Sequence, residues 1–120
     1  MTAARLNLLV IRSQEPARTV HFYELLGLRF QEEQHGKGPV HWAAESGSLV
    51  MEIYPAQSEC EVERTTRLGF EVVDVESILA SLRNHDVQVV SDLKQSPWGL
   101  RAIVRDPDGR SVELVQMRVK

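Results

Sequence analysis

The pattern of secondary structure expected from this sequence occurs twice along the chain. In the first half, an apolar strand over 6–11 precedes a helix, which proline at its first position and glycine at its end predict for Pro16 to Gly27. Three stretches with strand character then follow, at 28–33, 40–44 and 49–54. The first half is therefore predicted to form one βαβββ unit.

The second half repeats this order. A strand over 68–73 leads to Asp74, a residue type that caps helices, and to apolar residues at helical spacing. Three further strands are expected, at 87–90, 100–105 and 111–117. Such self-similarity predicts a duplicated βαβββ unit and an α+β fold, with the polar stretch 57–66 as the joint.

Composition narrows the class of protein. A chain of 120 residues that is 42% hydrophobic suits one compact domain with a sizeable core. Its formal net charge of −3 and interspersed charges predict no nucleic-acid partner. No apolar run approaches the roughly 20 residues of a spanning helix, so no membrane partner is expected. The start lacks a secretory pattern, which predicts a cytoplasmic location, and Cys60 has no partner for an internal disulfide.

A turn near the end of the chain precedes an apolar strand that contains a glutamate, Glu113. The stretch 106–109 reads Asp-Pro-Asp-Gly, in which proline presets φ and glycine accepts a left-handed conformation. Glu113 follows between apolar residues, where strand propensity and burial both disfavour it. Glu52 holds the corresponding place in the first half. A pair of glutamates at equivalent strand positions indicates a shared role.

Two segments closely resemble the signature stretches of the vicinal oxygen chelate superfamily, 17–28 and 106–114. This superfamily includes glyoxalase I, extradiol dioxygenases, fosfomycin-resistance enzymes and bleomycin-resistance proteins, and the resemblance covers nearly the whole chain. It implies one glyoxalase-like domain over 1–120, with modules at about 5–55 and 66–117. It also implies curved mixed sheets around a cavity, helices on the outer faces, a small-molecule ligand and a homodimer. Fold alone does not determine the activity.

The resemblance also implies a divalent metal held by the first and fourth strands of each module. Position by position, these sites fall on Leu8 and Glu52 in module one and on Arg67 and Glu113 in module two. Leucine has no donor atom, and arginine is a permanent cation. Two carboxylates alone make a poor transition-metal site. We therefore predict that the usual metal site is lost, and we assign no metal ligand and no cofactor.

Strand alternation predicts which side chains share the cavity face. If Leu8 faces the cavity, so does Arg12, and if Arg67 faces it, so does Glu71. A two-residue turn at Ser46-Gly47 would pair His41 with Glu52. The predicted cavity set is Arg12, His41, Glu52, Tyr54, Arg67, Glu71 and Glu113, with Trp98 and Arg101 as further ligand contacts.

Roles follow from the chemistry of these side chains. Arg67 is expected to supply the positive charge that a metal supplies in relatives, or to bind a ligand carboxylate in bidentate fashion. His41 is the candidate general base, because a neighbouring carboxylate would hold its tautomer, and Glu113 is the second catalytic candidate. Structural roles are the alternative for several of these residues. Arg67 could simply be exposed at the start of a strand, Trp98 could serve in packing, and His35 could belong to a turn.

Three functions remain open. The first is a glyoxalase-like protein or enzyme, of lyase or isomerase type, acting on a small polar or anionic metabolite through an enolate. The second is a bleomycin-resistance-type protein that binds a cationic drug without turnover, which acidic and aromatic side chains would suit. The third is a divalent-metal-dependent lyase or dioxygenase whose ion is held by His41, Glu52 and Glu113.

Overall fold

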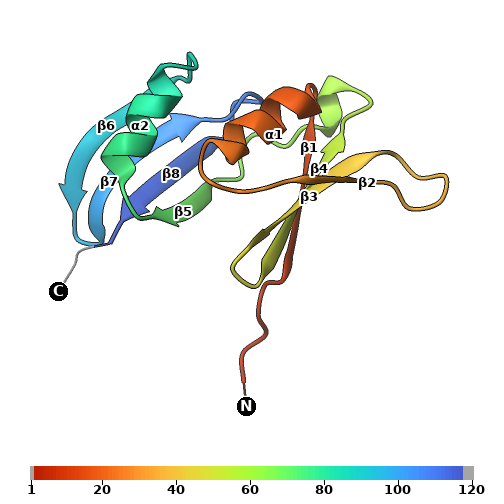
Figure 1. The fold of residues 1–120 in the computed structure, drawn as a ribbon, viewed down its shortest axis with the longest axis horizontal. Coiled ribbons are helices and arrows are strands. Elements are labelled where there is room, and N and C mark those ends of the chain that lie inside the picture. The colour runs from red at the N-terminus through yellow and green to blue at the C-terminus, as the bar shows by residue number, and fades with distance from the viewer. Residues whose placement is uncertain (1, 118–120) are drawn as a thin grey trace. The chain divides into compact units, whose positions relative to one another are not determined.

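The computed structural model describes residues 2–117 and divides into two compact units, with the boundary between Val62 and Glu63 (Figure 1). The first unit contains β1 (Leu8–Ser13), α1 (Pro16–Glu24), β2 (Gln31–Glu33), β3 (His41–Ser46), β4 (Leu49–Pro55) and the short 3-10 helix Glu59–Glu61. The second unit contains β5 (Leu68–Val72), α2 (Val75–Arg83), β6 (Val89–Ser96), β7 (Gly99–Arg105) and β8 (Ser111–Gln116). No helix among residues 2–117 is long and apolar enough to cross a membrane.

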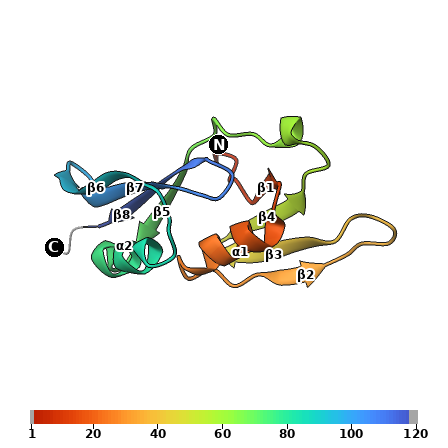
Figure 2. The ribbon, with the colours of Figure 1, turned by 90° about the horizontal axis from the view of Figure 1, so that it is seen from above.

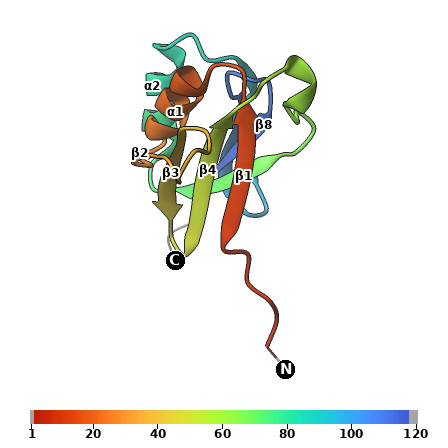
Figure 3. The same cartoon turned by 90° about the vertical axis from the view of Figure 1, so that its right-hand side faces the viewer.

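Each unit forms one four-stranded mixed sheet with the same topology. The strand orders are β1-β4-β3-β2 and β5-β8-β7-β6. In both, the first strand runs parallel to the fourth, and the remaining pairs are antiparallel. Figure 3 shows β3, β4 and β1 side by side. The predicted α+β fold of two βαβββ units is confirmed.

One face of each sheet is covered by the helix of its own unit. In the first unit, α1 contacts β1 and β4, and buries Phe22 and Tyr23 against a core that includes Ile11, Met51 and Ile53. The opposite side of β1 carries exposed residues in alternation with these. We call the side of each sheet opposite its helix the helix-free face. Alternation along β1 therefore follows the predicted pattern.

The second unit is built in the same way. The side chain of Asp74 accepts a hydrogen bond of 3.1 Å from the backbone N–H of Ser77, which confirms the predicted helix cap. Figure 2 shows α2 along one face of its sheet. The helix buries Val75, Leu79 and Leu82 on that face. The hydrophobic stripe expected from the sequence is thus the one that packs on the sheet.

The turn between β3 and β4 differs from the prediction. Ser46 pairs with Leu49, so the two central residues are Gly47 and Ser48 rather than Ser46 and Gly47. Gly47 has φ +60, and a type II′ hairpin turn places glycine at its first central position. Glu52 consequently pairs with Ala43, not with His41. Because the pairing moves by two residues, His41 still shares a face with Glu52.

Several strand ends also differ from the predicted ones. β2 covers only Gln31–Glu33 of the predicted 28–33, and β3 runs to Ser46 rather than to residue 44. β1 begins at Leu8 rather than at residue 6, and β6 runs from Val89 to Ser96, well beyond the predicted 87–90. β6 is an edge strand with two irregularities in its pairing to β7. Most of β6 was not predicted because its residues are mainly polar and alternate residues are exposed, whereas the prediction relied on apolar stretches.

The Asp-Pro-Asp-Gly turn is held by a buried ion cluster that the sequence analysis did not identify. Arg110 is fully buried, with Nη1 at 3.1 Å from Asp106 Oδ2 and 3.5 Å from Asp108 Oδ2. Asp106 Oδ1 also accepts hydrogen bonds from the backbone N–H groups of Asp108 and Arg110. The carboxylate of Asp106 therefore fixes the turn and balances the arginine charge.

Replacement of Arg110 is expected to destabilise the protein. Arg110→Met would leave the buried carboxylates of Asp106 and Asp108 without their cation and lower the free energy of unfolding by about 3–5 kcal/mol, as measured by urea denaturation. Arg83→Met removes an exposed arginine paired with Asp92 and serves as the control, with no measurable change expected. Equal stability of the two variants would contradict this account.

A second prediction concerns the start of β7. Gly99 has φ +137, and a Cβ there would lie 2.3 Å from the backbone oxygen of Gln116. Gly99→Ala is expected to lower the free energy of unfolding by about 2–3 kcal/mol, because both the backbone and the contact are strained. Gly47→Ala, at φ +60 with open space around it, is the matched control and should cost about 1 kcal/mol in the same denaturation assay.

Candidate functional site

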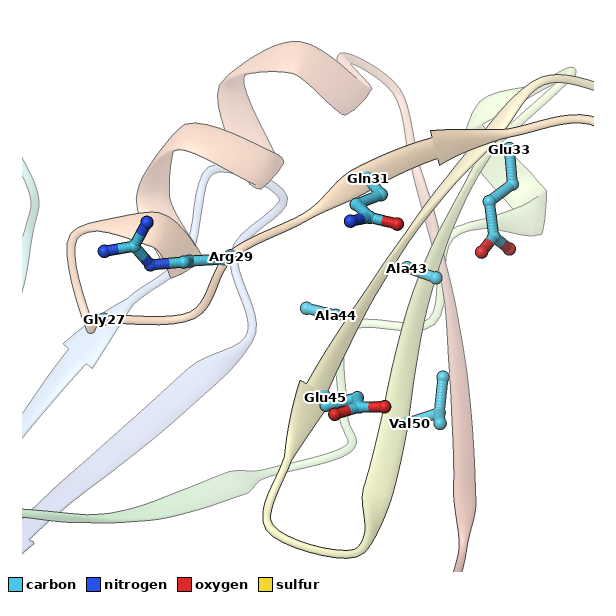
Figure 4. Close-up of a pocket in the computed structure, with 8 residues that line it drawn as sticks. All are labelled: Gly27, Arg29, Gln31, Glu33, Ala43, Ala44, Glu45 and Val50. Atoms are coloured by element: carbon cyan, nitrogen blue, oxygen red, sulfur yellow. The ribbon is translucent and has the colours of Figure 1, made fainter.

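The helix-free face of the first unit carries a pocket of about 550 Å³. It is lined by Gly27, Arg29, Gln31, Glu33, Ala43, Ala44, Glu45 and Val50 (Figure 4). In Figure 4, the side chains of Glu33 on β2 and Ala43 on β3 point to the same side, and that of Ala44 points the other way. Apart from Arg29, the charged residues of this pocket are acidic.

His41 lies in a buried position on the same face. Its Nδ1 is 3.2 Å from the carbonyl oxygen of Pro39, and a carbonyl only accepts, so we assign the proton to Nδ1. In the neutral ring, Nε2 is then an acceptor. This nitrogen lies 3.3 Å from Glu33 Oε1 and 3.8 Å from Glu52 Oε2. His41 thus presents a lone pair towards two carboxylates.

Aromatic and cationic contacts extend this cluster across the sheet. The rings of His41 and Tyr54 stack, with centroids 4.3 Å apart and an interplanar angle of 6°. The guanidinium carbon of Arg12 lies 5.1 Å from the Tyr54 ring centroid, a cation–π geometry. The structure therefore brings together the four candidate residues predicted in this unit: Arg12, His41, Glu52 and Tyr54.

Glu33 and His35 join His41 in a group that the sequence analysis did not identify. His35 Nε2 lies 3.6 Å from Glu33 Oε1, and one ligand-type atom from each of the three residues falls within 4.8 Å of the others. Glu33 pairs with His41 across β2 and β3. The sequence signal for these three residues is a Glu-x-His segment, Glu33 to His35, that pairs with a strand carrying another histidine. The signal can be recognised only when the pairing of β2 with β3 is known.

The second unit has its own pocket of about 450 Å³. Its lining residues are Arg67, Gly69, Phe70, Glu71, Trp98, Arg101, Glu113, Val115 and Met117. Five residues proposed from the sequence meet here, namely Arg67, Glu71, Trp98, Arg101 and Glu113. The candidate residues of the chain are thus gathered into two groups, one in each unit.

Glu113 is held by two arginines within this pocket. Arg101 Nη2 lies 2.7 Å from Glu113 Oε2, and Arg67 Nη2 lies 3.6 Å from the same oxygen. The Nε of Arg101 is buried and makes no hydrogen bond within residues 2–117. Trp98 is 66% exposed at the turn between β6 and β7. The pocket therefore combines guanidinium donors with an exposed aromatic ring.

Strand register makes the two groups equivalent. Glu52 pairs with Val10 and Ala43, as Glu113 pairs with Gly69 and Ile103. His41 lies two residues before Ala43, and Arg101 lies two residues before Ile103, so the two basic residues hold equivalent positions on the third strands. Both contact the fourth-strand glutamate of their unit. Each module thus sets one basic side chain of its third strand beside a central carboxylate.

The positions at which the superfamily resemblance implies a metal do not fit one. By the same register, Leu8 and Arg67 are equivalent, two residues before the partners of the glutamates. Leu8 offers no donor atom, and Arg67 brings a guanidinium to within 3.6 Å of the Glu113 carboxylate. A cation in that place competes with a metal for the carboxylate.

Solved structures with this fold include proteins of several kinds. The chain is similar to TnmS3, an antibiotic binding protein from Streptomyces sp. CB03234, with 22% identity, a TM-score of 0.75 and coverage of 98% of this chain and 99% of that one. Oxidase ChaP-H2 has 16% identity, a TM-score of 0.78 and coverage of 98% and 96%. TioX from Micromonospora sp. ML1 has 19% identity, a TM-score of 0.73 and coverage of 96% and 100%. At these identities the likeness shows the fold.

No curated protein matches the sequence. The family model described as Glyoxalase/Bleomycin resistance protein/Dioxygenase superfamily matches residues 5–114, which is most of the chain. That match agrees with the two βαβββ units and with the solved structures above. The chain belongs to the glyoxalase/bleomycin resistance protein/dioxygenase superfamily.

Proposed function

We propose that this chain binds a small molecule carrying a carboxylate and an apolar part, in the pocket of the second unit. The observation that carries the proposal is the pair of guanidinium groups of Arg67 and Arg101 around Glu113. Arginine presents planar N–H donors that match a carboxylate in bidentate fashion. The proposal therefore makes these two residues the anchor of the ligand.

Exposure supports this assignment of roles. The Arg67 side chain is 60% exposed, so part of its donor fork faces solvent, and the Arg101 side chain is 20% exposed. Glu113 holds both guanidinium groups in place, which favours a positioning role for its carboxylate over proton transfer. Trp98 and Met117, 66% and 50% exposed, offer apolar surface to the rest of the ligand.

Proton transfer by His41 is proposed separately, for an enzyme of glyoxalase type whose substrate binds in the first unit. The lone pair of Nε2 suits a general base, and the Nδ1–H bond to Pro39 fixes the ring. Glu33 and Glu52 lie close to this nitrogen and would stabilise the imidazolium formed when it takes a proton. The acid–base group would then act on a substrate with an acidic C–H.

Binding of a cationic drug is the second candidate function. Glu33 and Glu45 line the pocket of the first unit, and within residues 2–117 Arg29 is its only basic lining residue. An acidic pocket suits a ligand of positive charge. TnmS3, with the same fold, is described as an antibiotic binding protein, which supports a binding role for this chain.

Self-association is proposed as well, because apolar side chains are exposed along an edge strand. Leu8 and Val10 on the edge strand β1 are 48% and 41% exposed, and Leu6, just before the strand, is 70% exposed. We expect sedimentation to give a homodimer and Val10→Asp to shift it to monomer. Val73→Asp, at a residue 94% exposed, should leave the dimer intact. A monomeric parent chain would contradict the proposal.

The ligand proposal is tested with a pair of probes that differ in charge. 3-Phenylpropanoate carries the anion and a ring, and 3-phenylpropanamide replaces the anion with a neutral group. Binding is followed by the NMR shift of the Trp98 indole N–H. We expect the anion to bind and Arg101→Met to weaken binding at least about tenfold, because a charge-assisted pair is lost. Arg83→Met, an exposed arginine on α2, should bind like the parent.

Two outcomes would contradict this proposal. Equal affinity for acid and amide would show that the guanidinium groups do not select the anion. Bleomycin is titrated in parallel as the cationic probe. Tight bleomycin binding that Arg101→Met leaves unchanged, together with no binding of the acid, would favour the second candidate function.

A further inference from the structure

We propose that Glu33, His35 and His41 form a site for a divalent transition metal on the β2–β3 hairpin. The site differs from the positions at which the superfamily resemblance implies a metal, which fall on the first and fourth strands. Two imidazoles and one carboxylate are a donor set suited to Zn²⁺, Co²⁺ or Ni²⁺. The proposal does not depend on ligand binding in the second unit.

The distances between the donor atoms suit one ion. Glu33 Oε1 lies 3.3 Å from His41 Nε2 and 3.6 Å from His35 Nε2. Zinc bonds of about 2.0–2.1 Å in tetrahedral geometry separate two donors by about 3.4 Å. All three donor atoms lie within 4.8 Å of one another. His35 is exposed, so its imidazole can reorient on metal binding without disturbing the core.

His41 provides an independent indication of a ligand. The residue is 1% exposed, and its Nε2 is buried with no hydrogen-bond partner within residues 2–117. A buried polar atom left without a hydrogen bond destabilises a fold, so such atoms call for a partner. The Nδ1–H bond to the Pro39 carbonyl is the arrangement that orients metal-binding histidines. With the proton assigned to Nδ1, the lone pair of Nε2 faces Glu33 and is available to a metal.

The hairpin itself holds the three residues together. Glu33 and His41 face each other as a pair between β2 and β3. His35 is set by a turn in which its carbonyl accepts the Gly38 N–H at 3.0 Å, and Gln34 Nε2 donates to the Gly38 carbonyl at 3.0 Å. Gly36 has φ +59, which this turn requires. The hairpin therefore holds the three residues near their metal-binding positions before any metal binds.

Such a site has consequences for the first unit. Three protein donors leave at least one coordination position for water or for a ligand. Glu33 also lines the pocket of about 550 Å³, so the metal would lie at its edge. A metal on Nε2 occupies the lone pair that a general base needs. In the metal-bound protein, His41 is therefore a ligand and not a base.

Metal binding is measured directly on the full chain, without a histidine tag and after treatment with chelator. We expect calorimetry to give one Zn²⁺ per chain with a micromolar Kd or tighter, and Co²⁺ to give visible absorption bands of a nitrogen–oxygen site. His35→Ala and Glu33→Gln should each weaken Zn²⁺ binding at least about tenfold, the scale on which even outer-shell partners act. His85→Ala, at an exposed histidine after α2, is the matched control and should bind like the parent.

The buried ring makes His41→Ala a poor test, because the variant could misfold. Metal binding by His41 is therefore measured in the folded parent chain. Zinc should shift the NMR signal of His41 Nε2 more than that of Nδ1. Absence of stoichiometric Zn²⁺ or Co²⁺ binding would overturn the proposal, as would binding that His35→Ala and Glu33→Gln leave unchanged. These outcomes are distinct from the Arg101→Met result, which tests the second unit.

Discussion

Pairing of the first strand with the fourth is the constraint on which both units depend. It makes β4 and β8 inner strands, each flanked by a parallel and an antiparallel neighbour. One face of such a strand must be apolar to pack under the helix, and its alternate residues face the other way. Glu52 and Glu113 occupy that second set, at the same step of the register. The topology therefore places both glutamates at the centre of their helix-free faces.

The neighbours of each carboxylate decide its chemistry. In the second unit, Arg101 and Arg67 form ion pairs with Glu113, which sets donor groups around a fixed negative charge. In the first unit, the equivalent third-strand position holds His41, which stacks on Tyr54 and directs Nε2 to carboxylates. One module thus offers guanidinium donors, and the other an imidazole acceptor. The same backbone arrangement therefore sets two different kinds of polar group beside its central glutamate.

Much of this arrangement follows from sequence periodicity. Alternation in 68–72 and in 8–13 predicts which side chains face the helix, and Asp74 predicts the start of α2, because these depend on local chemistry. The β3–β4 register was predicted wrongly, since either of two residue pairs around Gly47 makes a plausible turn. The burial of Arg110 also escaped prediction. A charged residue is predicted to be exposed unless its ion-pair partners are known. For Arg110 those partners depend on a turn and on tertiary packing.

Glu33 and His35 show why a site is harder to predict than a fold. Each residue alone is an ordinary polar residue of an edge strand or a loop. Their chemistry arises only when β2 pairs with β3, which sets Glu33 opposite the buried His41. A two-residue error in register keeps a side chain on its face but changes its neighbours. Faces are therefore predictable from alternation, whereas the groups that bind metals or substrates depend on the exact pairing and on the turns between the strands.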